Sequence, residues 1–207
     1  MKSILPLVCL LLACVSARAN DVINPDFVYF TQGQTPGTWQ WVLADPGNWW
    51  QPIPDSGGAS AKGKVRLENA GDESFPGAIK LKWSKSSDWG SVSLSGAPVN
   101  LAKYEQAAEL VLAVKVMSKV PDTVDLVMHC GEGCEAKVNI AANLKQGPRK
   151  QWFALPLALD CFTANGLDLT KLSGPFSLGT GGKFELHIAE ISLATLAEGD
   201  QGCVPNP

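Results

Sequence analysis

Charged residues are scarce in this chain, and no basic patch or basic run occurs along it. Asp, Glu, Lys and Arg make up only 18% of the 207 residues. Without concentrated positive charge, nucleic acid and anionic membranes are poor partners, and we expect neither. Long stretches of helical hydrophobic periodicity, internal repeats and a dividing linker are also absent. The 45% hydrophobic content therefore predicts one compact folded domain rather than a disordered chain.

Motifs for catalysis and metal binding are missing as well. The two histidines, His129 and His187, have no His-x-x-x-His spacing, and no Ser–His–Asp order stands out. A glycoside hydrolase minimally needs two carboxylates at the right separation, but none of the 20 acidic residues lies in a distinctive motif. We therefore predict no catalytic residue and no metal site.

The first residues have the pattern of an export signal. Lys2 is a basic n-region, Ile4–Val15 is an apolar segment too short to span a bilayer comfortably, and Ala17–Ala19 is a small-x-small cleavage site. We therefore assign residues 1–19 to a signal peptide and 20–207 to a single exported domain, periplasmic or extracellular. Leu11–Cys14 also resembles a lipobox. The alternative is an outer-membrane lipoprotein, whose only membrane contact is a lipid anchor at Cys14.

The most regular pattern lies between Thr123 and Leu144. On both sides of the sequence CGEGC, apolar residues occupy even positions and mainly polar residues the odd ones (even: Val124, Leu126, Met128, Ala136, Val138, Ile140, Ala142, Leu144). This alternation predicts a hairpin with one buried and one wet face. The predicted register pairs Met128 with Ala136 and Leu126 with Val138, because a slip of one residue would expose the apolar face.

Four cysteines follow the leader: Cys130, Cys134, Cys161 and Cys203. In an oxidising compartment they suggest two disulfides, for which three connectivities are possible. The hairpin register favours Cys130–Cys134, which leaves Cys161 to pair with Cys203. A zinc site is disfavoured, since paired Cys-x-x-Cys units and nearby histidines are lacking.

Short alternating segments continue along the chain. The expected strands are Phe27–Thr31, Trp39–Leu43, Val65–Glu68, Ile79–Trp83, Trp89–Ser95, Glu109–Val120, Phe153–Leu159, Pro175–Leu178 and Phe184–Leu193. Pro46–Pro54 is expected to be irregular because of its prolines. Pro156 places its strand at a sheet edge or bulge, and Gly166–Ser173 is expected to form one helical turn. Together these segments predict an all-β sandwich.

The chain is rich in tryptophan, with seven residues, and these are its most informative residues for function. An indole can stack on the apolar face of a sugar ring and donate one hydrogen bond, so exposed tryptophans can hold neutral carbohydrate. Trp83 alternates with the same spacing as the apolar Ile79 and Leu81 of its strand, so we expect it to face the core. Trp39 and Trp41 could belong to the core or to a platform. The platform candidates are Trp49, Trp50 and Trp89, with Asn48, Asp55 and Asp88 as nearby hydrogen-bonding groups. The alternative is that these rings plug the end of the sandwich.

Trp49 and Trp50 are neighbours in the chain, and adjacent residues of an extended segment point opposite ways. We therefore expect only one of the two rings to form the platform with Trp89.

Several motifs resemble the C-terminal galactose-binding-like, ExoP-type domain of bacterial family 3 exo-β-glucosidases. They occur in order at Ala78–Ser84, Gly96–Leu101, Cys130–Cys134, Trp152, Leu157–Phe162, Gly166–Leu169 and Pro175–Phe176. The resemblance is clear from about Ala78 to Leu193 and looser over Phe27–Asp45. It implies a jelly-roll β-sandwich of the carbohydrate-binding-module type and a structural role for Trp152. In that family the catalytic residues lie in preceding domains, for which this chain has no residues.

Two positions depart from that family's pattern. Asn100 stands where the family usually has Asp, and Lys115 where it usually has Arg. If those charges support contacts between domains in the parent enzymes, their loss suits a free-standing domain.

The predicted function is a secreted, non-catalytic protein that binds a β-glucan-type polysaccharide by aromatic stacking. The alternatives are an accessory module that docks onto a secreted glycoside hydrolase or an envelope complex and, least favoured, a glycoside hydrolase itself. No cofactor is expected. By analogy with other sandwiches, a structural calcium between the first and last strands, held by Glu68 or Glu190, stays open.

Overall fold

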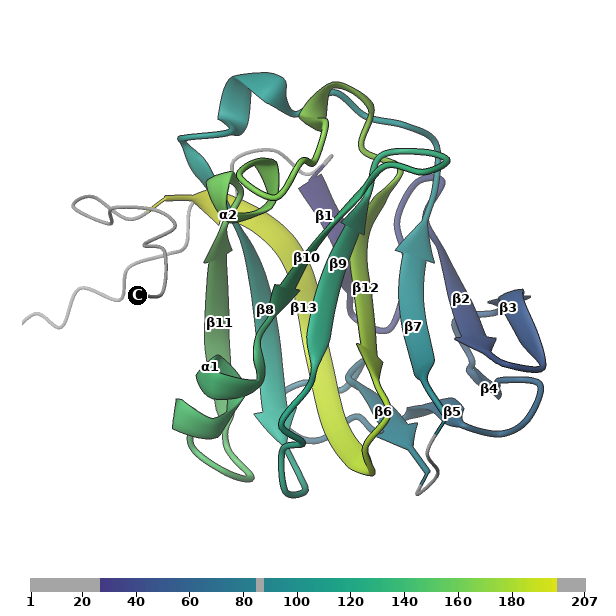
Figure 1. Cartoon of the computed structure of the whole chain (residues 1–207). Helices are drawn as coiled ribbons and strands as arrows, with labels where there is room; N and C mark the ends of the chain where they lie inside the picture. Colours follow the sequence, from purple (N-terminus) through teal and green to yellow (C-terminus); the bar gives the residue numbers. More distant parts are fainter. Residues whose placement is uncertain (1–26, 85–87, 197–207) are drawn as a thin grey trace, which may run out of the picture.

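Two antiparallel β-sheets packed face to face form the core of the computed structural model, which describes residues 27–84 and 88–196 (Figure 1). Sheet I has the strand order β10-β9-β12-β7-β2-β3, and sheet II has the order β11-β8-β13-β6-β5-β4, with β1 pairing to β13. Figure 1 shows sheet I in front of sheet II. This arrangement confirms the predicted all-β jelly-roll sandwich.

The strands of sheet I are β2 (Gln40–Asp45), β3 (Asn48–Ile53), β7 (Gly90–Ser95), β9 (Asp125–His129), β10 (Glu135–Asn139) and β12 (Gly174–Thr180). Those of sheet II are β1 (Val28–Thr31), β4 (Gly58–Ala59), β5 (Val65–Asn69), β6 (Ile79–Trp83), β8 (Ala108–Val116), β11 (Trp152–Ala158) and β13 (Phe184–Thr195). Most predicted strands therefore exist, although β8 ends at Val116 instead of Val120.

The core lies between the two sheets and follows from the alternation along each strand. In β7, Val92 and Leu94 are fully buried, whereas Ser91, Ser93 and Ser95 are only half-buried and point to the other face. Trp39, Trp41 and Trp83 also belong to the core. The two tryptophans left open between core and platform are thus core residues.

The central hairpin has the predicted register. Met128 lies opposite Ala136 and Leu126 opposite Val138, and the amide of Ile140 donates to the carbonyl of Val124 over 2.9 Å. The strand pattern was wrong beyond Ile140, because helix α1 (Ala141–Gln146) follows at once. Ala141 and Leu144 are buried there, a spacing of three residues that suits one face of a helix.

The expectation that Pro46–Pro54 is irregular was also wrong, since this segment contains β3. β3 is an edge strand that pairs with β2 alone, and Pro52 lies opposite Val42. An edge strand tolerates a residue without an amide hydrogen where its nitrogen faces away from the partner. Pro156 obeys the same rule as predicted, because β11 is the edge strand of sheet II.

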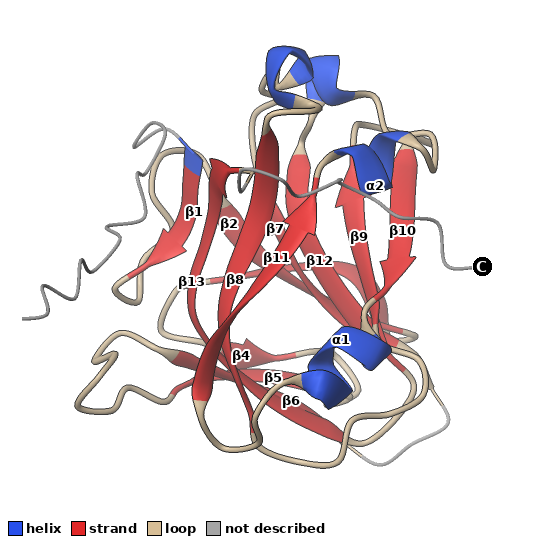
Figure 2. Ribbon diagram, turned by 90° about the vertical axis from the view of Figure 1, so that its left-hand side faces the viewer, coloured by secondary structure: helices blue, strands red, loops and turns tan. Residues whose placement is uncertain are grey.

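Short helices lie outside the sheets. Helix α1 connects β10 to β11, and α2 (Asp160–Thr163) follows β11, so both lie along the side where these edge strands come together (Figures 1 and 2). The 3₁₀ turns are η2 (Ala102–Tyr104) and η3 (Leu169–Lys171), and η3 confirms the turn expected in Gly166–Ser173. Among the helices of 27–84 and 88–196, none has the length and apolar character needed to cross a membrane. The leader and Cys14 lie outside the described residues.

A groove on the outer face of sheet I as the candidate functional site

A groove with a volume of about 690 Å³ runs across the outer face of sheet I. Every strand of this sheet contributes to its lining, from Trp50 of β3 at one edge to Lys137 of β10 at the other. The groove therefore follows the sheet from edge to edge and is assembled from distant parts of the chain.

Small residues form the floor of the groove. The register places Ser93 between Val42 of β2 and Ser177 of β12, and Ser177 beside Val127 of β9. In the next row, Ser91 lies between Ala44 and Gly179. The hydroxyl of Ser93 donates to that of Ser177 over 2.7 Å. Because these outward positions have little bulk, the larger side chains around them leave a hollow.

The β3 side of the groove is aromatic. Trp49 and Trp50 are 60% and 58% exposed, and they are the exposed large hydrophobic residues of the described chain. Since Pro52 lies opposite Val42, strand alternation places Trp50 on the outer face of sheet I. Both rings nevertheless line the groove. The β2–β3 register is interrupted between Leu43 and Asp45, so regular alternation of neighbouring side chains does not hold through this part of β3.

Trp89 lies beside this aromatic edge and is half-buried. It precedes β7, and its indole lies directly over Gly179 of β12. A Cβ atom at position 179 would come within 2.6 Å of Cζ2 of this indole. Gly179 therefore creates the seat for Trp89, a role that the sequence pattern did not indicate.

The polar residues proposed as partners of the tryptophans do not line the groove. Asp55 accepts hydrogen bonds from the amide and hydroxyl of Thr35, at 3.3 and 3.0 Å. Asn48 accepts one from the amide of Trp50 over 2.9 Å, and so shapes the turn before that ring. Asp88 is exposed and contributes an electrostatic interaction with Lys64. None of these three is among the described residues that line the groove.

Titratable side chains of the β9–β10 hairpin line the other side of the groove: Asp125, His129, Glu132, Glu135 and Lys137. Lys137 Nζ lies 3.7 Å from Asp125 Oδ2, and His129 Nδ1 lies 3.4 Å from Glu135 Oε2. Burial lowers the pKa of His129, and the nearby Glu135 carboxylate offsets part of that effect. Sequence reasoning missed this cluster, although the odd positions of the hairpin marked it as the wet face.

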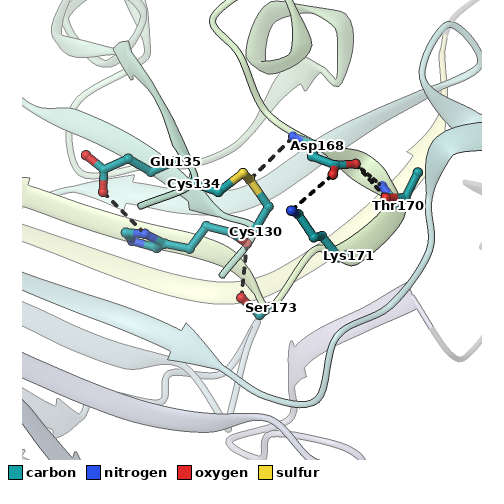
Figure 3. The surroundings of a disulfide bond; sticks show 8 residues. Cys130, Cys134, Glu135, Asp168, Thr170, Lys171 and Ser173 are labelled. Atoms are coloured by element: carbon teal, nitrogen blue, oxygen red, sulfur yellow. Dashed lines mark hydrogen bonds and ion pairs between the residues drawn. A yellow bond between two sulfur atoms is a disulfide. The ribbon is translucent and has the colours of Figure 1, made fainter. Parts of the chain in front are cut away.

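A disulfide closes the hairpin at this end of the groove (Figure 3). Cys130 is bonded to Cys134 as predicted, with their Cα atoms 5.0 Å apart. Gly131 and Gly133 between them have φ angles of 102° and 67°, which favour glycine. The amide of Asp168 donates to Cys130 Sγ over 3.3 Å, so the turn is also tied to the loop that contains η3. Cys203 lies outside the described residues, and its pairing with Cys161 stays a prediction.

Trp152 is structural, as the family resemblance implied. Its indole N–H donates to Asp72 Oδ2 over 2.9 Å on the outer face of sheet II. The ammonium of Lys115 pairs with the same carboxylate and lies 4.5 Å from the centre of the indole. Where the family usually has Arg, this chain thus has a lysine that is paired within the domain.

The remaining candidates lie away from the groove. Glu68 pairs with Lys80, and Glu190 accepts a hydrogen bond from Ser192 over 2.8 Å. Within 27–84 and 88–196, no three His, Cys, Asp or Glu side chains gather in a way that could hold a metal ion. His187 lies in β13 of sheet II, and burial is the main cause of its lowered pKa. Calcium binding by Glu68 or Glu190 stays a prediction.

Sequence and structural comparisons agree on the class to which this fold belongs. Residues 38–193 match the ExoP C-terminal family, described as galactose-binding domain-like. The chain therefore belongs to this family of galactose-binding-like β-sandwiches. No curated protein matches the chain.

Among solved structures, the chain is similar to the extra C-terminal domain of the exo-1,3/1,4-β-glucanase ExoP from a Pseudoalteromonas species. The identity is 15% and the TM-score 0.69, and the match covers 86% of this chain and 99% of that domain.

Two carbohydrate-binding modules share the fold. A family 30 module has 13% identity and a TM-score of 0.57, over 82% of this chain and 98% of the module. A family 11 module from Clostridium thermocellum, solved with a β-1,3-1,4-mixed-linked tetrasaccharide, has 9% identity and a TM-score of 0.52. That match covers 81% of this chain and 94% of the module.

Proposed function

We propose that this protein is a non-catalytic carbohydrate-binding protein that holds a β-glucan-type polysaccharide in the groove of sheet I. Trp89 and Trp50, with Trp49 as the alternative ring of β3, stack on sugar rings along the aromatic side, and the serines of the floor and the charged side chains of the hairpin meet sugar hydroxyls. The observation that carries the proposal is the pair of strongly exposed indoles beside a groove of this size. Its family membership and its fold, shared with two carbohydrate-binding modules, add support.

Two neighbouring indoles exposed to water carry a free-energy cost. Burying apolar area stabilises by about 25 cal/mol per Å², and an indole buries up to roughly 250 Å², so an uncovered pair represents a large unused driving force for binding. A sugar ring has an apolar face that can cover an indole and a hydroxyl rim that needs polar partners. The groove provides both kinds of surface side by side.

The extent of the groove favours a chain over a single sugar. Neighbouring strands lie about 4.8 Å apart, so a groove that crosses all strands of sheet I extends roughly 24 Å. This length accommodates several consecutive sugar units.

The arrangement of carboxylates favours binding over hydrolysis. Asp125, Glu132 and Glu135 all come from β9, β10 and the turn between them, so they lie on one side of the groove. Asp125 pairs with Asn139 and Glu135 with His129, which separates the two carboxylates by four residues along the hairpin. At about 3.3 Å per residue the backbone at Asp125 and at Glu135 is roughly 13 Å apart, and no described carboxylate lines the opposite, tryptophan side of the groove, whereas glycosidases use two carboxylates about 5–9.5 Å apart that flank the scissile bond.

Export is part of the proposal. The basic Lys2, the apolar Ile4–Val15 and the cleavage pattern Ala17–Ala19 support a secreted protein, and a lipid anchor at Cys14 is the alternative. A secreted glycoside hydrolase that acts on the same polysaccharide is a proposed partner.

Retardation of the protein in native gels that contain soluble neutral β-glucans tests the function. We expect retardation by mixed-linked β-1,3-1,4-glucan or by another neutral β-glucan. Trp50→Ala should weaken binding at least about tenfold, equal to about 1.4 kcal/mol, with nearly unchanged melting temperature because its ring is exposed. Trp89→Ala should lose binding with a moderate loss of stability, since this ring is half-buried. Parallel Trp49→Ala measurements show whether one ring or both contribute.

Other outcomes would favour the alternatives. Failure to bind any polysaccharide, combined with co-elution of a secreted hydrolase that Trp50→Ala abolishes, would favour a docking module. The proposal also predicts that no sugar is released from aryl β-glucosides or β-glucans. Turnover that a single substitution at Asp125 or Glu135 abolishes would identify a hydrolase instead.

A further inference from the structure

The two ends of the groove differ in chemistry. The three tryptophans lie at the β3 and β7 side, whereas every charged lining residue comes from the β9–β10 hairpin. A polysaccharide that crosses the groove would therefore meet stacking surfaces first and charged acceptors next. The charged half needs an explanation of its own, since indole stacking does not use it.

Asp125 is the unusual residue of this half. It lies in the groove lining, and its side chain is only 10% exposed. Its one ionic partner in the described part of the chain is Lys137, at 3.7 Å, and that lysine side chain is 62% exposed. Water screens such an ion pair strongly. The described residues provide no hydrogen-bond donor to the Asp125 carboxylate, although a buried carboxylate is costly unless donors reach it.

The neighbouring serines do not satisfy this carboxylate. Asp125 lies beside Gly179, which has no side chain, and the Ser93 and Ser177 hydroxyls are bonded to each other one row away. Its free lone pairs therefore remain available to hydroxyl groups that enter the groove. A carboxylate offers about four acceptor sites, so it can receive two hydroxyls from neighbouring carbons of one sugar ring.

The net charge of the hairpin half of the groove discriminates between neutral and anionic carbohydrates. Three carboxylates and one ammonium line the hairpin half, a formal charge of −2 with His129 neutral. Burial keeps the pKa of His129 below its ordinary value of 6.5, which supports the neutral form at pH 7. A uronic acid or a sulfate ester placed here would meet repulsion, whereas a neutral hexose would not.

We propose that the hairpin half of the groove is a subsite for a neutral sugar unit, which Asp125 binds by accepting its hydroxyl hydrogens, and that Asp125, Glu132 and Glu135 exclude anionic polysaccharides. This inference rests on the proposed carbohydrate-binding function and names the class of ligand: neutral glycans, as opposed to those rich in uronate, sulfate or carboxymethyl groups.

Two derivatives of one glucan backbone make a matched pair of probes: neutral hydroxyethylcellulose and anionic carboxymethylcellulose. Wild-type protein at pH 7 and about 10 mM ionic strength, where charges interact over about 30 Å, should bind the neutral derivative at least about tenfold more tightly. Raising the ionic strength to about 0.15 M shortens that range to about 8 Å and should reduce the discrimination.

Variants of the carboxylates separate the two parts of the inference. Asp125→Ala should weaken binding to hydroxyethylcellulose by about tenfold to a hundredfold, the usual effect of losing a charged acceptor. Asp125→Asn keeps the shape and one acceptor oxygen, and should fall between Ala and wild type. Glu132→Gln/Glu135→Gln should raise carboxymethylcellulose binding at low salt, so that the ratio of neutral to anionic affinity falls. Glu73→Gln, an exposed carboxylate outside the groove, is the matched control and should change neither.

The outcomes also separate this inference from the proposed function. Wild-type affinity for hydroxyethylcellulose in both Asp125 variants, or equal affinity for the two derivatives at low salt, would overturn the inference. In that case loss of binding in Trp50→Ala would still support the function. If wild-type protein binds no neutral glucan at all, the function and the inference fall together.

Discussion

A surface tryptophan is packed and hydrogen-bonded on the outer face of sheet II, whereas two tryptophans are exposed on the outer face of sheet I. On sheet II, Trp152 donates to Asp72, packs edge-on against Phe75 with ring centres 4.8 Å apart, and lies beside the Lys115 ammonium. On sheet I, Trp49 and Trp50 remain more than half exposed beside a groove. Both faces belong to the same sandwich, so fold alone does not explain the difference.

The loop between β5 and β6 is the reason. It contains Asp72 and Phe75 and brings them onto Trp152, so one segment covers that ring and satisfies its N–H. No described loop covers the indoles of Trp49 and Trp50 in this manner. A tryptophan with its ring packed and its N–H bonded contributes to stability, whereas an uncovered one is available to a ligand.

The largest expected effect is on stability at Trp152. Trp152→Ala should lower the free energy of unfolding by about 2–3 kcal/mol, because the half-buried ring joins Asp72, Phe75 and Lys115. Thermal unfolding should show a drop of about 5–10 °C for a domain of this size. Polysaccharide retardation should stay at the wild-type level, the reverse of Trp50→Ala. Unchanged melting, or lost binding in a folded variant, would contradict this division between the two faces.

A smaller effect is expected at Gly179, on binding. A methyl group there would come within 2.6 Å of the Trp89 ring and must displace it. Gly179→Ala should lower polysaccharide affinity by about threefold to tenfold, equal to about 1 kcal/mol, measured by titration calorimetry or gel retardation. Because the effect acts through Trp89, Gly179→Ala/Trp89→Ala should bind no more weakly than Trp89→Ala alone. Additive losses would show that Gly179 acts independently of the ring.

The smallest effect concerns acid stability on sheet II. The pKa of Asp72 lies well below its usual value of 3.8. The largest cause is the hydrogen bond from Lys115, and the next is the hydrogen bond from Trp152. The folded state then binds fewer protons than the unfolded state in acid. The stabilisation by ionised Asp72 is therefore complete above pH about 4 and is lost as pH falls toward the lower, folded-state pKa.

Denaturant unfolding between pH 5 and 2 tests this sign. Asp72→Asn should be less stable than wild type at pH 5, and the difference should shrink as pH falls. Lys115→Met should produce a similar flattening, because it removes the main cause of the pKa shift. A wild-type pH slope in both variants would show that ionisation of Asp72 does not contribute to stability in this pH range.

Much of the fold could be predicted because it depends on local alternation. The hairpin register and the Cys130–Cys134 disulfide follow from even-numbered apolar residues and a short turn with glycines. The two local errors also have local causes. Three prolines and a glycine in Pro46–Pro54 hid the edge strand β3, and the helical spacing of Ala141 and Leu144 was concealed within a strand-like alternation.

The candidate site could be predicted only in part. Trp49, Trp50 and Trp89 could be predicted to lie together, and all three line the groove, since large rings in a proline-rich segment or on a serine-bearing face have few places in a core; their role in binding stays a prediction. Their polar partners could not be predicted, because Asn48, Asp55 and Asp88 are neighbours in sequence rather than across the sheet. Asp125 and Gly179 reach the groove from strands far along the chain.

The sequence by itself determined which side chains of each strand face the core and which face outward, because that choice depends on backbone geometry repeated every two residues. Only the tertiary structure decided which outward faces meet. Ser93 and Ser177 are 84 positions apart, yet their hydroxyls touch on the groove floor. Their strands are neighbours because the buried faces of sheet I and sheet II pack together in one arrangement, and the groove is formed by what that packing leaves on the other side.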